Sequence, residues 1–210
     1  MDIDVQLSKR LSWLLRHGAI LEGFQIGPDG YVEVDAILHH PRYARDFNLE
    51  NLKHIVDKDK KQRYSLRLNS RGLYEIRANQ GHSIDEVKAS HALERIYKAD
   101  DVKFAVHGTY YKYWPQIKRE GLRPMGRLHI HFAIYDEDGK KGDKNSCISG
   151  IRSNVNILIY LHVRKAMECG GMQIYRSSNN VMLSSGIDGC IPKEYFLKVI
   201  DRRTGQELPF

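Results

Sequence analysis

Several cationic and imidazole side chains of this sequence are of the kinds that hold and transform phosphate groups. Arg16 and His17 stand together at the end of an apolar helical pattern. Arg63 has a planar guanidinium that can hold two phosphate oxygens at once. It follows a basic run of Lys58, Lys60 and Lys61. Each feature also has a simpler explanation, because cations near a helix carboxyl end are favoured by the dipole and lysines are mostly solvated. Phosphate binding and an ordinary surface role are both open at this point.

Further polar residues stand where predicted strands begin or end. Arg77 closes one strand and precedes the polar run Asn79-Gln80-Gly81-His82-Ser83, which is typical of a turn but can also line a site. In His107-Gly108-Thr109, the glycine permits close approach of a ligand and its neighbours offer hydrogen bonds. Arg127 and Arg152 lie near strands in the same half, although most arginines are surface residues. The sequence contains neither Gly-x-Gly-x-x-Gly nor a P-loop motif, which excludes those two nucleotide sites.

The bulk composition favours an intracellular protein with a polyanionic partner. The formal charge is +7 and the pI is about 9.2, which favours RNA or DNA; a basic protein without a nucleic-acid role is the alternative. No run approaches the roughly 20 apolar residues of a membrane span. The acidic start, Met1-Asp2-Ile3-Asp4, does not resemble a signal peptide, so we expect a location in the cytoplasm, the nucleus or both. We expect Cys147, Cys169 and Cys190 to be reduced thiols that bind no metal.

The elements that must position these residues divide into two domains, residues 1–90 and 91–210. In the first, apolar residues at helical spacing predict a helix that Gly18 stops. A turn at 27–30, a short strand at 31–34, a helix after Asp35 and another at 49–56 follow. Alternating residues then predict a hairpin of strands 64–68 and 73–77. Three helices followed by a hairpin are typical of a winged-helix module, which often binds nucleic acid.

The second predicted domain is rich in strands, and its boundary lies within 81–99. We expect strands at 104–107, 129–132 and 155–161, a helix at 111–120 that Gly121 ends, and a hairpin of 172–175 with 181–183. Residues 136–145 are almost wholly charged or glycine and predict an exposed loop. The chain as a whole is therefore expected to be an α+β protein with a helical first lobe and a β-rich second lobe.

Eight short blocks, in this order, carry a resemblance to a known family. They are Leu15-Arg16-His17, Gly27-Pro28-Asp29-Gly30-Tyr31-Val32, Asp59-Lys60-Lys61-Gln62-Arg63-Tyr64, Ile76-Arg77-Ala78-Asn79-Gln80-Gly81-His82-Ser83, Val106-His107-Gly108-Thr109, Gly126-Arg127-Leu128-His129-Ile130-His131, Ser149-Gly150-Ile151-Arg152 and Tyr175-Arg176-Ser177-Ser178-Asn179-Asn180-Val181. From about Leu7 to Phe196 the chain resembles the RNA 2'-phosphotransferases, also called tRNA 2'-phosphotransferases. Single blocks are uninformative, but eight in the right order are highly specific.

The resemblance implies a winged-helix RNA-binding lobe and an ADP-ribosyltransferase-like lobe that binds NAD⁺. It implies a catalytic set of Arg16, His17, Arg63 and Arg127, with the RNA phosphate held between the lobes. It further implies NAD⁺ contacts from His107, Gly108, Thr109, His131 and, for the pyrophosphate, Arg152. Arg77 and His82 would position RNA or join the lobes. Val181 falls where many other ADP-ribosyltransferases have a glutamate, and Ala133 replaces a serine that many relatives have.

The implied reaction consumes NAD⁺ as a co-substrate in two steps and needs no metal. The RNA 2'-phosphate attacks the ribose carbon and expels nicotinamide, which gives a 2'-phospho-ADP-ribosyl RNA. The 2″-hydroxyl then attacks the phosphorus and releases RNA and ADP-ribose 1″,2″-cyclic phosphate. The residue types suit this chemistry, because an anionic phosphate needs no base and a carboxylate would repel it. Guanidinium groups orient the phosphate and stabilise its developing charge.

The expected partners are therefore NAD⁺ and a tRNA with an internal 2'-phosphate at a splice junction, and we expect a monomer. Two other functions fit parts of the same evidence. An ADP-ribosyltransferase that caps phosphorylated RNA or DNA ends would need the same NAD⁺ site but no second step. A winged-helix RNA-binding module with a degenerate second lobe would need no reaction at all.

Overall fold

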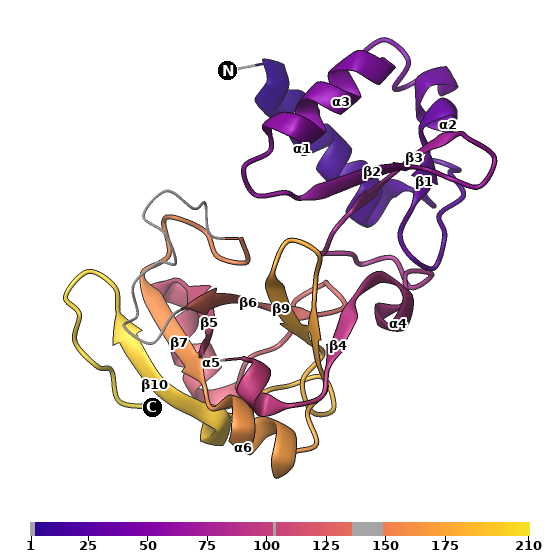
Figure 1. Ribbon diagram of the computed structural model, residues 1–210. Coiled ribbons are helices and arrows are strands. Elements are labelled where there is room, and N and C mark those ends of the chain that lie inside the picture. Colours follow the sequence, from indigo (N-terminus) through magenta and orange to yellow (C-terminus); the bar gives the residue numbers. More distant parts are fainter. Residues whose placement is uncertain (1–2, 103, 136–148) are drawn as a thin grey trace. The chain divides into compact units, whose positions relative to one another are not determined.

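The computed structural model describes residues 3–102, 104–135 and 149–210, in two compact units, Met1–Ala92 and Leu93–Phe210 (Figure 1). Helices and sheets are both present, which confirms the predicted α+β class. The predicted loop at 136–145 and Cys147 lie outside the described residues. Within the described residues, no helix has the length and apolar character needed to cross a membrane.

The first unit combines helices with a small antiparallel sheet of order β1-β3-β2. Its helical elements are α1 (Ile3–Trp13), a π-helical turn (Leu14–Gly18), α2 (Val34–His39), α3 (Leu49–Lys58) and the short α4 (Ala89–Ala92). Its strands are β1 (Val32–Glu33), β2 (Tyr64–Leu68) and β3 (Tyr74–Ala78). The three predicted helices and the predicted hairpin are thus present, with β3 one residue later than expected.

Buried aliphatic side chains explain why the first helix forms. Leu11, Leu14 and Leu15 are fully buried in one core that the helices share with the sheet. The α-helix widens into a π-helical turn after Trp13, and this turn ends at Gly18 as predicted. However, Ala19 is still helical, and the left-handed residue that turns the chain away is Gly23, at φ 81°. Gly18 serves another purpose, because a Cβ there would lie 2.3 Å from the Trp13 ring.

The β2–β3 hairpin is held in a single register. Tyr64 pairs with Ala78, Leu66 with Ile76 and Leu68 with Tyr74. Its inward face is buried at Tyr64 and Ile76, which join the core of the first unit. Arg63 immediately precedes β2. Because Tyr64 pairs with Ala78, this register places Arg63 opposite the polar residues that follow β3.

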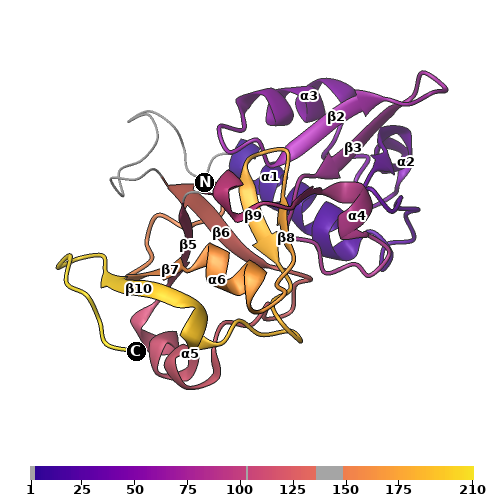
Figure 2. The same cartoon turned by 60° about the horizontal axis from the view of Figure 1, so that its bottom comes forward.

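The second unit is built on a seven-stranded antiparallel sheet of order β10-β7-β5-β6-β9-β8-β4 (Figures 1 and 2). The strands are β4 (Glu94–Ile96), β5 (Phe104–Thr109), β6 (Ile130–Tyr135), β7 (Ile157–Leu161), β8 (Ile174–Arg176), β9 (Val181–Ser184) and β10 (Phe196–Asp201). Two helices, α5 (Trp114–Glu120) and α6 (Val163–Glu168), and three 3-10 turns, Ala99–Asp101, Tyr111–Tyr113 and Lys193–Tyr195, connect them.

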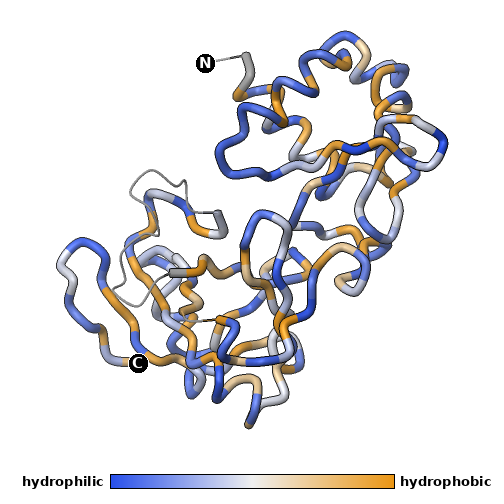
Figure 3. The backbone as a smooth tube through the Cα atoms, viewed as in Figure 1, coloured by the Kyte–Doolittle hydropathy of each residue, from blue (hydrophilic) through white to orange (hydrophobic). Residues whose placement is uncertain are grey.

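The interior strands of this sheet are hydrophobic on both faces. All five residues of β7 are buried, and Figure 3 shows its path coloured largely hydrophobic. β7 pairs with β5 on one side and with β10 on the other. This arrangement places His107, Gly108 and Thr109 at the end of β5, opposite Ile159, Leu158 and Ile157. The sequence predicted β5 through β9, but not β4, α6 or β10.

Candidate functional site

Arg16 and His17 lie in the π-helical turn and are attached to a distant polar segment, Asn79-Gln80-Gly81-His82-Ser83. The backbone N–H of Ser83 donates to the carbonyl of Arg16 at 2.9 Å. The Ser83 hydroxyl lies 2.8 Å from Nδ1 of His17. At Gly81 the chain adopts φ 92°, and a Cβ there would come within 3.3 Å of Nε of Arg16. The backbone at Gly81 therefore lies against the Arg16 side chain, and the segment fixes the turn at two residues.

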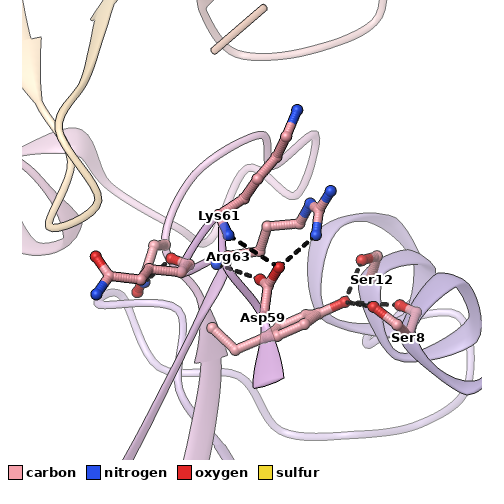
Figure 4. Close-up of polar contacts among 8 residues, drawn as sticks. Ser8, Ser12, Asp59, Lys61 and Arg63 are labelled. Carbon is pink, nitrogen blue, oxygen red and sulfur yellow. Dashed lines mark hydrogen bonds and ion pairs between the residues drawn. The ribbon is translucent and has the colours of Figure 1, made fainter. Parts of the chain in front are cut away.

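Arg63 is held by a carboxylate four residues earlier in the chain. The buried Asp59 accepts from Nη1 of Arg63 at 2.5 Å and from its backbone N–H at 2.6 Å. It also accepts from the backbone N–H of Lys61 at 3.2 Å. Figure 4 shows the side chains of Lys61 and Arg63 extending upward in the view, with Asp59 below them. Asp59 thus orders the loop, and the Arg63 side chain remains 36% exposed.

Asn79 connects the Arg63 loop to the polar segment. Its backbone N–H donates to the Arg63 carbonyl at 2.8 Å, and its side-chain amide donates to the Gln62 carbonyl at 2.7 Å. The Ser65 hydroxyl donates to the Asn79 side-chain oxygen at 2.6 Å. One end of the five-residue segment is therefore bonded beside Arg63 and the other end beside Arg16 and His17. Three of the four predicted catalytic residues are linked through this segment within the first unit.

Arg77 and His82 contact a turn of the same unit. Nη1 of Arg77 donates to the Asp29 carbonyl at 3.1 Å, and its guanidinium lies 4.9 Å from the centre of the Tyr31 ring. A Cβ on Gly30 would lie 3.2 Å from Nε2 of His82. These contacts stabilise residues 29–31, and a contact of either side chain with RNA stays a prediction.

In the second unit, four of the five predicted NAD⁺ residues lie on the neighbouring strands β5 and β6, whereas Arg152 lies between β6 and β7. His107 is hydrogen-bonded through Nδ1 to the His131 carbonyl at 2.9 Å. Because a carbonyl only accepts, Nδ1 carries the proton and Nε2 is an acceptor in the neutral ring. Burial lowers the pKa of His107, and this hydrogen bond opposes the shift in part. Thr109 and His131 are also buried, so this part of the unit is a polar cluster within an apolar sheet.

Arg127 and Arg152 are brought close enough for their charges to interact. Burial lowers the pKa of Arg127, and the positive charge of Arg152 lowers it further. His129, two residues after Arg127, also has a pKa lowered by burial. Guanidinium groups suit phosphate oxygens, and a phosphate or pyrophosphate contact from Arg127 or Arg152 stays a prediction.

Comparison with known proteins assigns the chain to one family. The family model for "RNA 2'-phosphotransferase, Tpt1 / KptA family" matches residues 2–186. The chain belongs to the RNA 2'-phosphotransferase, Tpt1 / KptA family. The family predicted from the eight blocks is confirmed, and so is the class of enzyme, a transferase.

Individual relatives of this family cover most of the chain. It is 43% identical over 195 residues to a putative tRNA 2'-phosphotransferase of Schizosaccharomyces pombe. That alignment covers 93% of this chain but only 51% of the relative. The chain thus spans about half the length of that relative. It is 40% identical over 206 residues to tRNA 2'-phosphotransferase 1 of Homo sapiens, which covers 96% of this chain and 78% of the human protein. It is 34% identical over 201 residues to the tRNA 2'-phosphotransferase of Saccharomyces cerevisiae, with 94% and 84% covered.

Three further residues support the predicted site, although no individual role was predicted for them from the sequence. Asp59 holds Arg63, Ser83 contacts His17, and the buried Tyr64 joins β2 to α1. Asp59 carried a usable signal, since it is an acidic residue within a basic run, between Lys58 and Lys60. Ser83 and Tyr64 stand in the blocks that carry the resemblance, but their contacts could not be predicted because their partners lie 66 and 56 residues away.

Proposed function

We propose that this chain removes the splice-junction 2'-phosphate from tRNA, with NAD⁺ as the co-substrate that accepts it. The observation that carries the proposal is the linkage of Arg16, His17 and Arg63 through one hydrogen-bonded segment, in a chain whose family is the RNA 2'-phosphotransferases. When bound, NAD⁺ supplies an ADP-ribosyl group that can receive the phosphate and a nicotinamide leaving group. We assign the winged-helix role to the first unit and the ADP-ribosyltransferase-like role to the second.

In the first unit, Arg16 and Arg63 orient the RNA 2'-phosphate. Guanidiniums suit this task, because they donate in a fixed planar fork and keep their charge at every physiological pH. The Asp59 carboxylate takes one edge of Arg63, so the remaining donors are presented in a fixed direction. His17 donates a hydrogen bond to the phosphate or transfers a proton, as its usual pKa near neutrality allows.

In the second unit, the residues fit NAD⁺ on two grounds. The Arg127 and Arg152 pair offers paired positive charge, and we assign Arg152 to the pyrophosphate and Arg127 to the transferred phosphate. Thr109 and His131 are buried, and together with His107 they supply hydrogen bonds for the ribose or amide of the dinucleotide.

A product analysis tests this proposal against its alternatives. The purified chain is incubated with an RNA oligonucleotide that carries one internal 2'-phosphate, with and without NAD⁺. We expect NAD⁺-dependent release of nicotinamide, RNA with a free 2'-hydroxyl and ADP-ribose cyclic phosphate. A stable ADP-ribosylated RNA end would instead support a capping ADP-ribosyltransferase. Binding of RNA without any release of nicotinamide would support a non-enzymatic RNA-binding module.

Substitution of Arg63 tests the role of the first unit. We expect Arg63→Ala to lower the single-turnover rate by at least a hundredfold, since one oriented donor at a developing anion is worth about 10²–10³ in rate. Arg71→Ala is the matched control, because Arg71 is an exposed arginine of the same unit that is paired with Glu33. A folded Arg63→Ala variant with the rate of the control would remove Arg63 from the site.

A further inference from the structure

Ser83 makes two contacts with the Arg16-His17 turn. Its backbone N–H donates to the Arg16 carbonyl at 2.9 Å, and its hydroxyl lies 2.8 Å from Nδ1 of His17. The first contact holds the backbone of the turn, whereas the second acts only on the imidazole ring. A substitution that removes only the hydroxyl is therefore expected to change the orientation of the His17 ring while the backbone contact that holds the turn remains.

The position of Ser83 is itself fixed by its own segment. The segment is bonded to Arg63 and Gln62 at Asn79, and it lies against Arg16 at Gly81. The hydroxyl consequently approaches His17 from a backbone that is held at both ends. A hydroxyl on a fixed backbone has few rotamers to lose, so the contact costs little entropy.

A hydroxyl has a property that a carboxylate or a carbonyl lacks, since it both donates and accepts. It can donate to Nδ1 of one neutral tautomer, and it can accept from Nδ1–H of the other tautomer or of the imidazolium. A carboxylate would instead stabilise the charged ring and add a negative charge beside the RNA phosphate. A carbonyl would allow only the forms with a proton on Nδ1, as it does for His107 in the second unit.

We propose that Ser83 is the positioning residue of His17. Its hydroxyl holds Nδ1 in every protonation state, and this directs Nε2 to the 2'-phosphate throughout the reaction. The inference rests on the proposed function for the identity of the phosphate, but the contact itself is independent of it. A two-step transfer needs such a partner, because the charge on the phosphate changes between the steps while the ring must keep its direction.

The test uses Ser83→Ala, Ser83→Thr and the matched control Ser90→Ala in the full chain. Ser90 belongs to another Ser–His contact of the first unit, with its hydroxyl 3.1 Å from Nδ1 of His91. Nitrogen-15 NMR of the imidazole rings, assigned with His17→Gln, reports the hydrogen bonding and titration of His17 without any substrate. Single-turnover rates with the 2'-phosphorylated RNA and NAD⁺ report its catalytic role.

We expect Ser83→Ala to keep the wild-type melting temperature, to change the Nδ1 signal of His17 and to lower the rate about ten- to a hundredfold. This expected loss of rate follows from the general observation that misplacing a catalytic group by about 1 Å can lower the rate about a hundredfold. The KM for RNA should change much less than kcat, and the pH–rate profile should shift. Ser83→Thr restores the signal and most of the rate, while Ser90→Ala changes neither.

Three results would overturn the proposal: an unchanged His17 signal in Ser83→Ala, an altered signal with a wild-type rate, or an equal loss of rate in Ser90→Ala. Failure of the wild-type chain to release nicotinamide would instead contradict the proposed function. In that case the NMR comparison still decides whether Ser83 holds the His17 ring.

Discussion

The phenol of Tyr64 offers the sharpest test of how the first unit is held together. Its hydroxyl donates to the Ser8 carbonyl at 2.7 Å and lies 2.9 Å and 2.5 Å from the hydroxyls of Ser8 and Ser12 (Figure 4). A phenol has one proton to give and can accept two, so all three contacts can exist together. They tie β2, and with it Arg63, to the helix that leads into Arg16 and His17.

Tyr64→Phe removes these three contacts and keeps the buried ring. A net hydrogen bond contributes about 0.5–1.5 kcal/mol. The Ser8 carbonyl retains its place in the helix, and the two serine hydroxyls lie in a partly buried region where they can find other partners. We therefore expect the free energy of unfolding to fall by about 1–3 kcal/mol, which is less than the sum of three full bonds.

Urea unfolding measures this loss, with Trp13 as the fluorescent reporter of the first unit in a Trp114→Phe background. At an m-value of about 1–3 kcal/mol per molar urea, the midpoint should fall by about 1 M. Ser70→Ala is the control, because it removes an exposed hydroxyl of the same unit. A Tyr64→Phe midpoint equal to that of the control would refute the reasoning, as would a zero coupling energy between Tyr64→Phe and the double substitution of Ser8 and Ser12 by alanine.

Three further predictions concern backbone space and pH. Gly81→Ala should lower the catalytic rate and cost about 1–2 kcal/mol of stability, because a left-handed backbone disfavours a Cβ and this Cβ would meet Arg16; a wild-type rate and melting temperature would contradict it. Gly108→Ala should raise the dissociation constant of NAD⁺ at least tenfold in calorimetry, since the added methyl would overlap Ile151; unchanged affinity would separate this strand end from NAD⁺. The buried His107 has a lowered pKa, so the unfolded chain binds its proton more tightly. Its contribution to stability is therefore full above pH ~6.5 and is lost as the pH falls below that value, which urea midpoints from pH 8 to pH 5 should show, with a smaller fall in His107→Gln.

Elements with a clear period were predicted correctly, whereas short elements without one were missed. The alternation in residues 64–68 fixed β2, and the helical spacing around Leu52 and Ile55 fixed α3. By contrast, β4 has three residues with Ile96 alone buried, and α6 has only six residues. The strand β10 is interrupted by a bulge between Phe196 and Lys198, which breaks the period of two.

The candidate site was predicted by residue type, but not its supports. Motif order located Arg16, His17 and Arg63, because the chemistry of phosphate restricts which side chains can serve. Asp59 and Ser83 depend on hydrogen bonds that only the folded chain creates. Gly18 illustrates the same limit, since its sequence position suggested a helix stop while the structure shows a contact with Trp13.

Because Leu14–Gly18 forms a π-helical turn, the number of residues in this stretch determines the direction of the Arg16 and His17 side chains as much as their identity does. A π turn accommodates about one residue more than an α turn, and successive α-helical residues are rotated by about 100°. Loss of a single residue here would let the chain relax into a regular helix and would swing every later side chain about a third of a circle. The helix would gain regular hydrogen bonds, yet arginine and imidazole would face a different neighbour. A one-residue deletion in this stretch is thus expected to abolish the reaction and, because Leu14 and Leu15 are fully buried, to destabilise the first unit as well.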